Sequence, residues 1–360
     1  MPTLIDDSQH NSSGLFGITN SNRTPERHWS KNCFNSSFPA AVACYLLEKN
    51  IPSVYNKLEI INGEPKVVSS EISLREVFNC HTFALKELDF CFESKFNPYQ
   101  QYSFSPIDSI DLVIKSISGK YLSPLEIKLT VLPTSNTSSR PEAEWGCELV
   151  VRSATTSYCA LGMFDSAKNE AKKIREIFES TCSGIGSWEN EFEMAHKTKS
   201  LYQCLNAFQQ TYLDRQKPLL MQTIWKTKGQ SPILADNAFD IIVWSDYAFS
   251  RLFIDGANLS QSVMSRPMRA TARLSRCLWE LSKSGKIQLS EIYRQMAFGT
   301  QTDKEFAIQG TKWREYTTSE RILKPIILKS ELGQIIDTAY IERLNPERRF
   351  DQTLYFTLRN

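Results

Sequence analysis

Two adjacent segments with the pattern of β-strands carry charged residues that could act together. The segment SIDLVIKSI contains Asp111, and the segment PLEIKLTVLP contains Glu126 and Lys128. Because side chains alternate between the two faces of a strand, Glu126 and Lys128 stand on the same face, about 7 Å apart. The apolar residues around them point to the opposite face, which indicates interior strands of a sheet. Charged side chains on such strands need a stabilising or functional reason.

A hairpin turn around Gly119 is expected to join these two segments, because glycine adopts the positive φ that tight turns require. Either of two simple two-residue turns places Asp111 on the same face as Glu126 and Lys128. A three-residue turn places Asp111 on the opposite face, unless a β-bulge resets the register. Two of the three simple geometries therefore bring the three charged residues together.

The chemistry that suits these three residues is metal-assisted hydrolysis of a phosphodiester. Two carboxylates held close together, here Asp111 and Glu126, repel each other unless a cation lies between them. Oxygen ligands select a hard ion, above all Mg²⁺. Such an ion would polarise a phosphate and acidify a water molecule, while Lys128 would hold the water or the phosphate oxygens. The alternative is an ordinary Glu-Lys pair on a strand, without a chemical role.

The composition argues against several other kinds of site. The chain has nine cysteines without a Cys-x-x-Cys pair and four scattered histidines, so a zinc hydrolase is not expected. Its net charge is only +2, so a site for a polyanion must come from a local concentration of Lys and Arg. The N-terminus lacks the pattern of a signal peptide, and the longest apolar run, residues 39–47, is too short to span a bilayer. We expect a soluble, cytoplasmic protein without a membrane partner.

The remaining sequence alternates between strand and helix patterns. Upstream of Asp111, the sequence indicates a short helix beginning near Ser37, a hairpin around Asn62-Gly63 and a helix over residues 71–87. Further on, we expect strands at residues 109–117, 121–133 and 146–153, followed by helices at residues 165–180 and 189–213. Strands at residues 219–226 and 239–245 and a last helix at residues 264–283 complete the pattern.

This order predicts an α/β fold with a mixed central β-sheet flanked by helices and a mainly helical C-terminal part. We divide the chain into an N-terminal arm (residues 1–30), a catalytic α/β core (residues 31–255) and a C-terminal helical region (residues 256–360), which is the candidate for recognition of the substrate. The last two regions could also form one continuous domain.

Several segments of the chain resemble a known group of nucleases. Asp111 followed by Glu126-Ile127-Lys128 on the next strand resembles the PD-(D/E)xK motif, with Asp108 as a second candidate for the first acid. Together with this motif, the chain resembles the HindVP-like type II restriction endonucleases in FGITNSNR (16–23), in WSKNCFNSSFPAAVACYL (29–46) and in residues 217–253.

The resemblance implies a restriction-endonuclease-like fold and Mg²⁺-dependent cleavage of double-stranded DNA. The expected catalytic residues are Asp111, Glu126 and Lys128, and the expected metal ligands are Asp111, Glu126 and the main-chain carbonyl of Ile127. It further implies a homodimer, a degenerate palindromic site of the form GRCGYC, and a cognate DNA methyltransferase that need not touch the enzyme.

Four arginines in the predicted helix over residues 264–283 are candidates for DNA contact. Arg266, Arg269, Arg273 and Arg276 are three or four residues apart and form one stripe on a helix. Arginine can hold phosphates or bind the O6 and N7 atoms of guanine. The alternative is an ordinary solvated helix face.

Three functions remain open from the sequence. The first is a type II restriction endonuclease, whose twofold dimer would match a palindrome. The second is a repair or recombination nuclease with the same motif and no sequence specificity. The third is a DNA-binding module that cuts nothing. Incubation with Mg²⁺ and a plasmid would give discrete fragments, a smear or uncut DNA, respectively.

Overall fold

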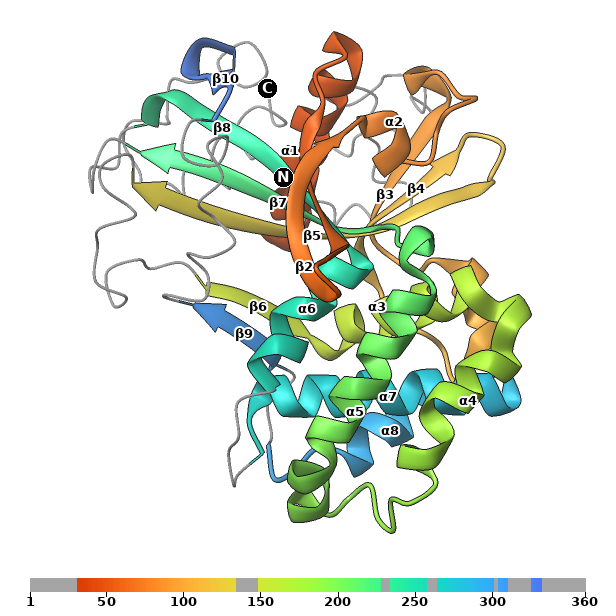
Figure 1. Cartoon of the computed structure of the whole chain (residues 1–360). Coiled ribbons are helices and arrows are strands. Elements are labelled where there is room, and N and C mark those ends of the chain that lie inside the picture. Colours follow the sequence, from red (N-terminus) through yellow and green to blue (C-terminus); the bar gives the residue numbers. More distant parts are fainter. Residues whose placement is uncertain are drawn as a thin grey trace, which may run out of the picture.

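A computed structural model describes residues 31–133, 148–227, 234–257, 264–300, 304–309 and 325–331. In these residues the chain forms a mixed eight-stranded β-sheet with helices packed against it (Figure 1), which confirms the predicted fold class. The predicted N-terminal arm lies outside the described residues. No helix among the described residues is long and apolar enough to cross a membrane.

The main sheet has the strand order β2-β1-β8-β7-β5-β4-β3, and β10 pairs with β8. The pairs β1/β8 and β5/β7 are parallel, and the other neighbours are antiparallel. Its strands are β1 (Ser53–Ile61), β2 (Glu64–Ile72), β3 (Leu88–Ser94), β4 (Ile110–Ser116), β5 (Tyr121–Pro133), β7 (Pro218–Thr227), β8 (Leu234–Ser245) and β10 (Ile327–Leu328). A second, two-stranded sheet pairs β6 (Glu148–Arg152) with β9 (Lys304–Gln309).

Eight α-helices and four short 3₁₀ helices are interspersed with the strands along the described part of the chain. The α-helices are α1 (Lys31–Lys49), α2 (Leu74–Val77), α3 (Ser153–Ala167), α4 (Ala171–Cys182), α5 (Glu191–Thr211), α6 (Asp246–Ala257), α7 (Arg266–Ser284) and α8 (Leu289–Gln295). Short 3₁₀ helices are η4 (Leu85–Glu87), η5 (Asn97–Tyr102), η8 (Lys168–Glu170) and η9 (Leu213–Arg215). The helix expected over residues 71–87 is therefore wrong for most of its length, because β2 continues to Ile72 and α2 has only one turn.

The hairpin between β4 and β5 has a register that depends on two compensating irregularities. The Ser116 N–H donates to the Lys120 carbonyl at 2.8 Å, which leaves a three-residue loop, residues 117–119, between these paired residues. Within it, the Gly119 N–H donates to the Ser116 carbonyl at 2.8 Å, with Gly119 at φ 87°. Taken alone, this loop would turn Asp111 to the other face. A bulge between Ile114 and Lys115 on β4, with Leu122 as the extra residue of β5, restores the register, so that Leu112 pairs with Leu125.

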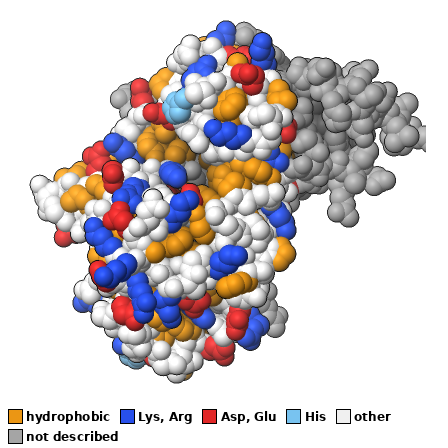
Figure 2. Space-filling model, turned by 90° about the vertical axis from the view of Figure 1, so that its right-hand side faces the viewer, with side chains coloured by type: hydrophobic (Ala, Val, Ile, Leu, Met, Phe, Trp, Pro, Cys, Tyr) orange, Lys and Arg blue, Asp and Glu red, His pale blue; other side chains and the backbone are white. Residues whose placement is uncertain are grey.

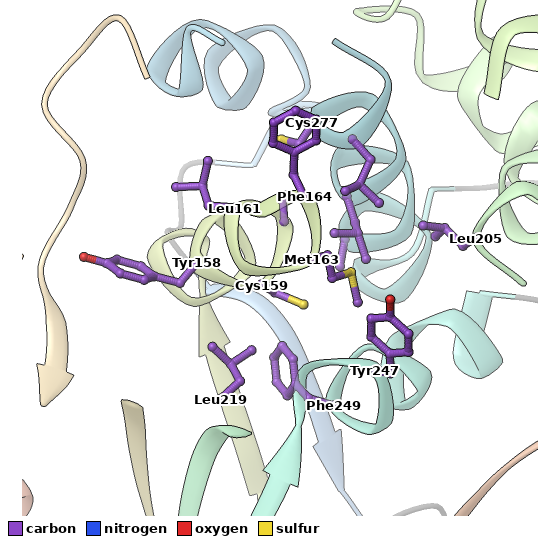
Figure 3. Close-up of a cluster of buried hydrophobic side chains, with 14 of the residues drawn as sticks. Tyr158, Cys159, Leu161, Met163, Phe164, Leu205, Leu219, Tyr247, Phe249 and Cys277 are labelled. Carbon is purple, nitrogen blue, oxygen red and sulfur yellow. The ribbon is translucent and has the colours of Figure 1, made fainter. Parts of the chain in front are cut away.

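Each face of the main sheet buries its own hydrophobic core. On one face, α1 and α2 cover apolar residues of the central strands, including Leu112, Leu125 and Ile127. On the other face, the core contains residues of α3, α5, α6 and α7. Figure 3 shows the centre of this second core, made by Tyr158, Cys159, Leu161, Met163 and Phe164 of α3 with Leu205, Leu219, Tyr247, Phe249 and Cys277 from other elements.

Helix α7 belongs to this second core, although it lies beyond the predicted domain boundary after residue 255. The helix begins as its sequence predicts, since the Ser265 hydroxyl accepts the Met268 N–H and proline occupies the first turn, and it ends before Gly285 in the left-handed region. It contacts α3, α4, α5 and α6. Hence one hydrophobic core runs across the proposed boundary between residues 255 and 256.

Candidate active site

The hairpin of β4 and β5 brings Asp111, Glu126 and Lys128 together on one face of the sheet. The Ile127 N–H donates to Asp111 Oδ2 at 2.9 Å, and Lys128 Nζ lies 3.7 Å from the same oxygen. Lys128 Nζ also donates to Glu126 Oε1. The neighbouring Leu125 and Ile127 point into the opposite core. The expected convergence of three charged side chains therefore exists, while their catalytic role stays a prediction.

The three side chains are largely enclosed but not sealed. The exposed fraction is 7% for the Glu126 side chain, 22% for Asp111 and 23% for Lys128. Burial, followed by the negative charge of Glu126, raises the pKa of Asp111 to about 7. Burial lowers the pKa of Lys128, but the charges of Glu126 and Asp111 outweigh this and raise it overall. The two carboxylates therefore repel each other, and the ammonium group of Lys128 offsets only part of their combined negative charge.

The donor set fits a hard divalent cation. Asp111 and Glu126 supply carboxylate oxygens from neighbouring strands, and burial together with the charge of Glu126 raises the pKa of Asp111, a rise that Lys128 opposes only in part. Within the described residues, no group of three or more His, Cys, Asp or Glu side chains is arranged to hold a metal ion. A Mg²⁺ ion keeps several waters and needs only one or two protein carboxylates, so Asp111 and Glu126 are enough for such an ion, and the expected ligand set with the Ile127 carbonyl stays a prediction.

Glu93 is an acidic residue near this site that the sequence did not indicate. It lies on β3, where Phe92 pairs with Leu112 and Ser94 pairs with Ile110, which puts Glu93 opposite Asp111. Its charge contributes, after burial and Glu126, to the raised pKa of Asp111. Glu93 adopts a positive φ of 47°, and this local irregularity has no signal in the sequence.

Asp108, the second candidate for the first acid of the motif, precedes β4 and is exposed. Its main-chain carbonyl accepts a hydrogen bond from the Tyr158 hydroxyl at 3.0 Å. No bond to Glu126 or Lys128 is found for Asp108 among the described contacts. Asp111, which directly contacts both the Ile127 N–H and the Lys128 ammonium, is therefore the better candidate.

The four candidate DNA-binding arginines of α7 do not form an accessible row. Arg266 is exposed, but Arg269, Arg273 and Arg276 are buried. Arg273 forms an ion pair with the buried Glu305 of β9. This corrects the expectation of an arginine stripe available to DNA, because charged groups buried in the core are kept there by partners within the chain.

The other donors of Arg273 and Arg276 are also used inside the protein. Arg273 donates to the main-chain carbonyls of Tyr293 and Met296. Arg276 donates from Nε to Glu280 at 2.6 Å, and its guanidinium lies 5.3 Å from the ring centroid of Trp188. These contacts hold α7 against its neighbours, so contact with DNA is retained as a proposal only for Arg266.

A separate pocket of about 350 Å³ lies where β5 and β7 begin, beside α2 and α3. Asp111, Glu126 and Lys128 do not line it. Three of its four charged residues are engaged within the chain, since Lys217 Nζ lies 3.7 Å from Asp165 and the Asp246 carboxylate accepts main-chain N–H groups; Glu76 is the fourth. Seen from the right-hand side of Figure 1, hydrophobic side chains gather near the middle of the molecule (Figure 2).

Comparisons with known proteins identify the family. The chain is 33% identical over 353 residues to the type II restriction enzyme HgiDI of Herpetosiphon aurantiacus, covering 97% of both chains. It is 32% identical over 345 residues to the probable type II restriction enzyme HindVP of Haemophilus influenzae, covering 95% of this chain and 92% of the relative. No solved structure matches significantly. Residues 29–359 match the family described as HindVP restriction endonuclease. The chain therefore belongs to the HindVP restriction endonuclease family and is an enzyme of the type II restriction class.

Proposed function

We propose that this enzyme hydrolyses phosphodiester bonds of double-stranded DNA at a short palindromic site in a Mg²⁺-dependent reaction, with Asp111, Glu126 and Lys128 as its catalytic residues. The observation that carries this proposal is the convergence of two carboxylates and one ammonium group on the β4–β5 hairpin. A palindrome of the form GRCGYC, inferred from the family resemblance, is a prediction within this proposal, as is a homodimer that would match its twofold symmetry.

Each residue has a separate task in this proposal. Asp111 and Glu126 would hold the metal ion together with the Ile127 carbonyl. A bound Mg²⁺ would supply Lewis-acid chemistry, polarising the scissile phosphate and acidifying a water molecule. The Ile127 N–H fixes the orientation of the Asp111 carboxylate through its hydrogen bond. Lys128, kept protonated by the two acids, would hold the attacking water or a phosphate oxygen and stabilise the growing negative charge.

The enzyme would work beside a cognate DNA methyltransferase that protects the sites of the host. This partner acts on the same DNA sequence and needs no physical contact with the endonuclease. A methyltransferase gene next to the gene of this chain would support this part of the proposal.

The test is cleavage of a plasmid by the purified protein, with Mg²⁺ and with EDTA. Discrete fragments that require Mg²⁺ are expected, and sequencing their ends gives the recognition site and the cut position. A smear would instead indicate a nuclease without sequence specificity. Uncut DNA that is nevertheless bound would indicate a DNA-binding module and would contradict the proposal.

A further inference from the structure

The pocket at the start of β5 and β7 has no role in the proposed cleavage reaction. Its volume of about 350 Å³ falls in the range of pockets that bind small organic molecules, roughly 300–1,000 Å³. Its walls come from α2, η5, β5, α3, β7 and α6. Helices α2 and α3 lie right of centre in Figure 1, on the side of the molecule that Figure 2 shows. The size of the pocket therefore suits a free small molecule.

Four aromatic side chains line this pocket and contact one another. The ring centroids of Phe96 and Tyr99 are 4.9 Å apart, and those of Phe96 and Tyr121 are 5.5 Å apart. The rings of Tyr99 and Tyr158 follow at 5.8 Å. Aromatic rings attract cations through the partial negative charge of their faces. Tyr121 already does so, since Lys115 Nζ lies 4.6 Å from its ring centroid, so the other three rings are those expected to meet a ligand.

Asp246 is a buried acid in the wall of the pocket, with an exposed fraction of 3%. The main-chain N–H groups of Lys217 and Tyr247 both donate to Asp246 Oδ1, at 3.0 and 2.8 Å. Among the residues that the structure describes, Asp246 Oδ2 has no hydrogen-bond or ion-pair partner, and this oxygen is not fully enclosed. Burial raises the pKa of Asp246 to about 7, so near neutral pH a bound cation could take the place of the proton.

The hydroxyl of Tyr99 is a second polar group that awaits a partner. Tyr99 has an exposed fraction of 7%, and within the described part of the chain its hydroxyl makes no hydrogen bond and is not fully enclosed. A Cβ placed on Gly162 of α3 would lie 3.1 Å from this oxygen. Burial raises the pKa of Tyr99, and the charges of Asp165 and Asp246 add to the rise, so the hydroxyl lies near both acids. Unpaired polar groups in a buried site mark where a ligand would bind.

The charged side chains of the pocket favour a cation over an anion. In the described part of the chain, its lining has three acids and one lysine, namely Glu76, Asp165, Asp246 and Lys217. Asp165 is already offset, because Lys168 Nζ lies 3.0 Å and Lys217 Nζ lies 3.7 Å from its carboxylate. The lysine is thus engaged by Asp165, and an ionised Asp246 lacks a matching positive charge.

We propose that this pocket binds a small organic cation, an ammonium group on an apolar or aromatic body, which donates hydrogen bonds to Asp246 Oδ2 and to the Tyr99 hydroxyl. The body of the ligand packs against the rings of Phe96 and Tyr158. This inference goes beyond the proposed function and does not depend on it, since such binding requires neither DNA nor Mg²⁺.

The test is isothermal titration calorimetry of the full chain with three probes that share one body and differ in charge. The probes are phenethylammonium, the neutral phenylethanol and the anionic phenylacetate. Phenethylammonium should bind with a Kd on the order of 1 mM, and the other two should bind roughly 10-fold more weakly or not at all. Asp246→Asn keeps an oxygen for the two main-chain N–H groups but removes the charge, so it should abolish the preference for the ammonium over the alcohol. Tyr99→Phe should weaken binding of the ammonium about threefold.

The matched control is Asp214→Asn, which removes an exposed acid of η9 outside the pocket lining and should bind the probes like the wild type. Equal affinity for the three probes, or no saturable binding of phenethylammonium, would overturn the inference. Unchanged affinity in both Asp246→Asn and Tyr99→Phe would also overturn it, because the cation would then bind elsewhere. If Asp246→Asn does not fold, Tyr99→Phe decides alone, since it removes only a hydroxyl group.

Discussion

The β4–β5 hairpin and helix α7 each carry a concentration of charged side chains, but these side chains differ in their exposure and in how their charge is balanced. On the hairpin, two acids and one lysine face each other with partial exposure, and the pKa of Asp111 is raised to about 7 by burial and by Glu126. On α7, Arg273 and Arg276 are buried and paired with Glu305 and Glu280. Charge that is balanced within the chain holds helices together, whereas charge left unbalanced indicates a site for an external partner.

The largest expected effect is on the hairpin. Glu126→Gln removes a carboxylate that would bind the metal, but the amide oxygen can still accept the Lys128 hydrogen bond, so the fold should persist. We expect the single-turnover cleavage rate to fall on the order of 10⁴-fold with DNA binding in EDTA unchanged. Glu64→Gln, at an exposed position of β2, is the control. Cleavage by Glu126→Gln at the wild-type rate would remove this residue from the active site.

On α7 the expected effect is on stability. Arg273→Leu leaves the carboxylate of Glu305 buried without its ion pair, which should lower the free energy of unfolding by about 4 kcal/mol. The double variant Arg273→Leu/Glu305→Leu should recover part of this loss, because it also removes the unpaired carboxylate of Glu305. Urea denaturation measures the free energy of unfolding of both variants.

The matched control for this prediction is Arg175→Leu, because its partner Glu179 is also solvent-exposed. Loss of such a surface pair should cost less than about 1 kcal/mol. Equal losses for Arg273→Leu and Arg175→Leu would show that the α7 pair does not differ energetically from a surface pair.

Asp246 is a third case, a fully buried acid whose protonated form is favoured by burial. Burial raises the pKa of Asp246 to about 7, although N–H groups of Lys217 and Tyr247 oppose the rise. The folded state therefore binds a proton at Asp246 more tightly than the unfolded state does. The stability that this bound proton contributes is lost as the pH rises from about 4 to about 7. Between pH 5 and pH 8 the free energy of unfolding should fall by about 3 kcal/mol through this group.

Asp246→Asn should flatten that pH dependence, since the amide oxygen can still accept the two main-chain N–H groups and does not titrate. Denaturant unfolding of both proteins at several pH values measures the difference. A variant whose stability falls with pH as steeply as the wild type would indicate that Asp246 is already ionised in the folded protein at low pH.

The smallest expected effect concerns Arg266, the exposed arginine at the start of α7. Arg266→Ala should change the free energy of unfolding by less than about 0.5 kcal/mol. If Arg266 contacts a DNA phosphate, the variant should also reduce the salt slope of binding by about 1. An unchanged slope would exclude α7 from the DNA interface at this position.

The hairpin could be predicted from the sequence because its information is local. Strand alternation placed Glu126 and Lys128 together, and a two-residue turn at Gly119 was expected to add Asp111. The observed loop has three residues, so Asp111 reaches the same face only through the bulge at Leu122, which the sequence allowed but did not predict. The burial of the α7 arginines could not be predicted in this way, because Glu305 lies on β9, beyond α8. Glu93 was missed because strand β3, whose pairing with β4 puts Glu93 opposite Asp111, was not predicted from the sequence. Apolar spacing predicted α5 and α7 close to their observed bounds. It was wrong for the one-turn α2, and it missed α3 and α6, which are so fully buried that they lack a polar face.

The two irregularities of the β4–β5 hairpin have a consequence for insertions and deletions. Shortening the loop at Gly119 by one residue, or removing Leu122 from the bulge, would rotate Asp111 away from Glu126 and Lys128. Removing one residue from each place would restore the original alignment with a shorter connection. Length changes in this hairpin should therefore survive in natural or engineered relatives only as matched pairs.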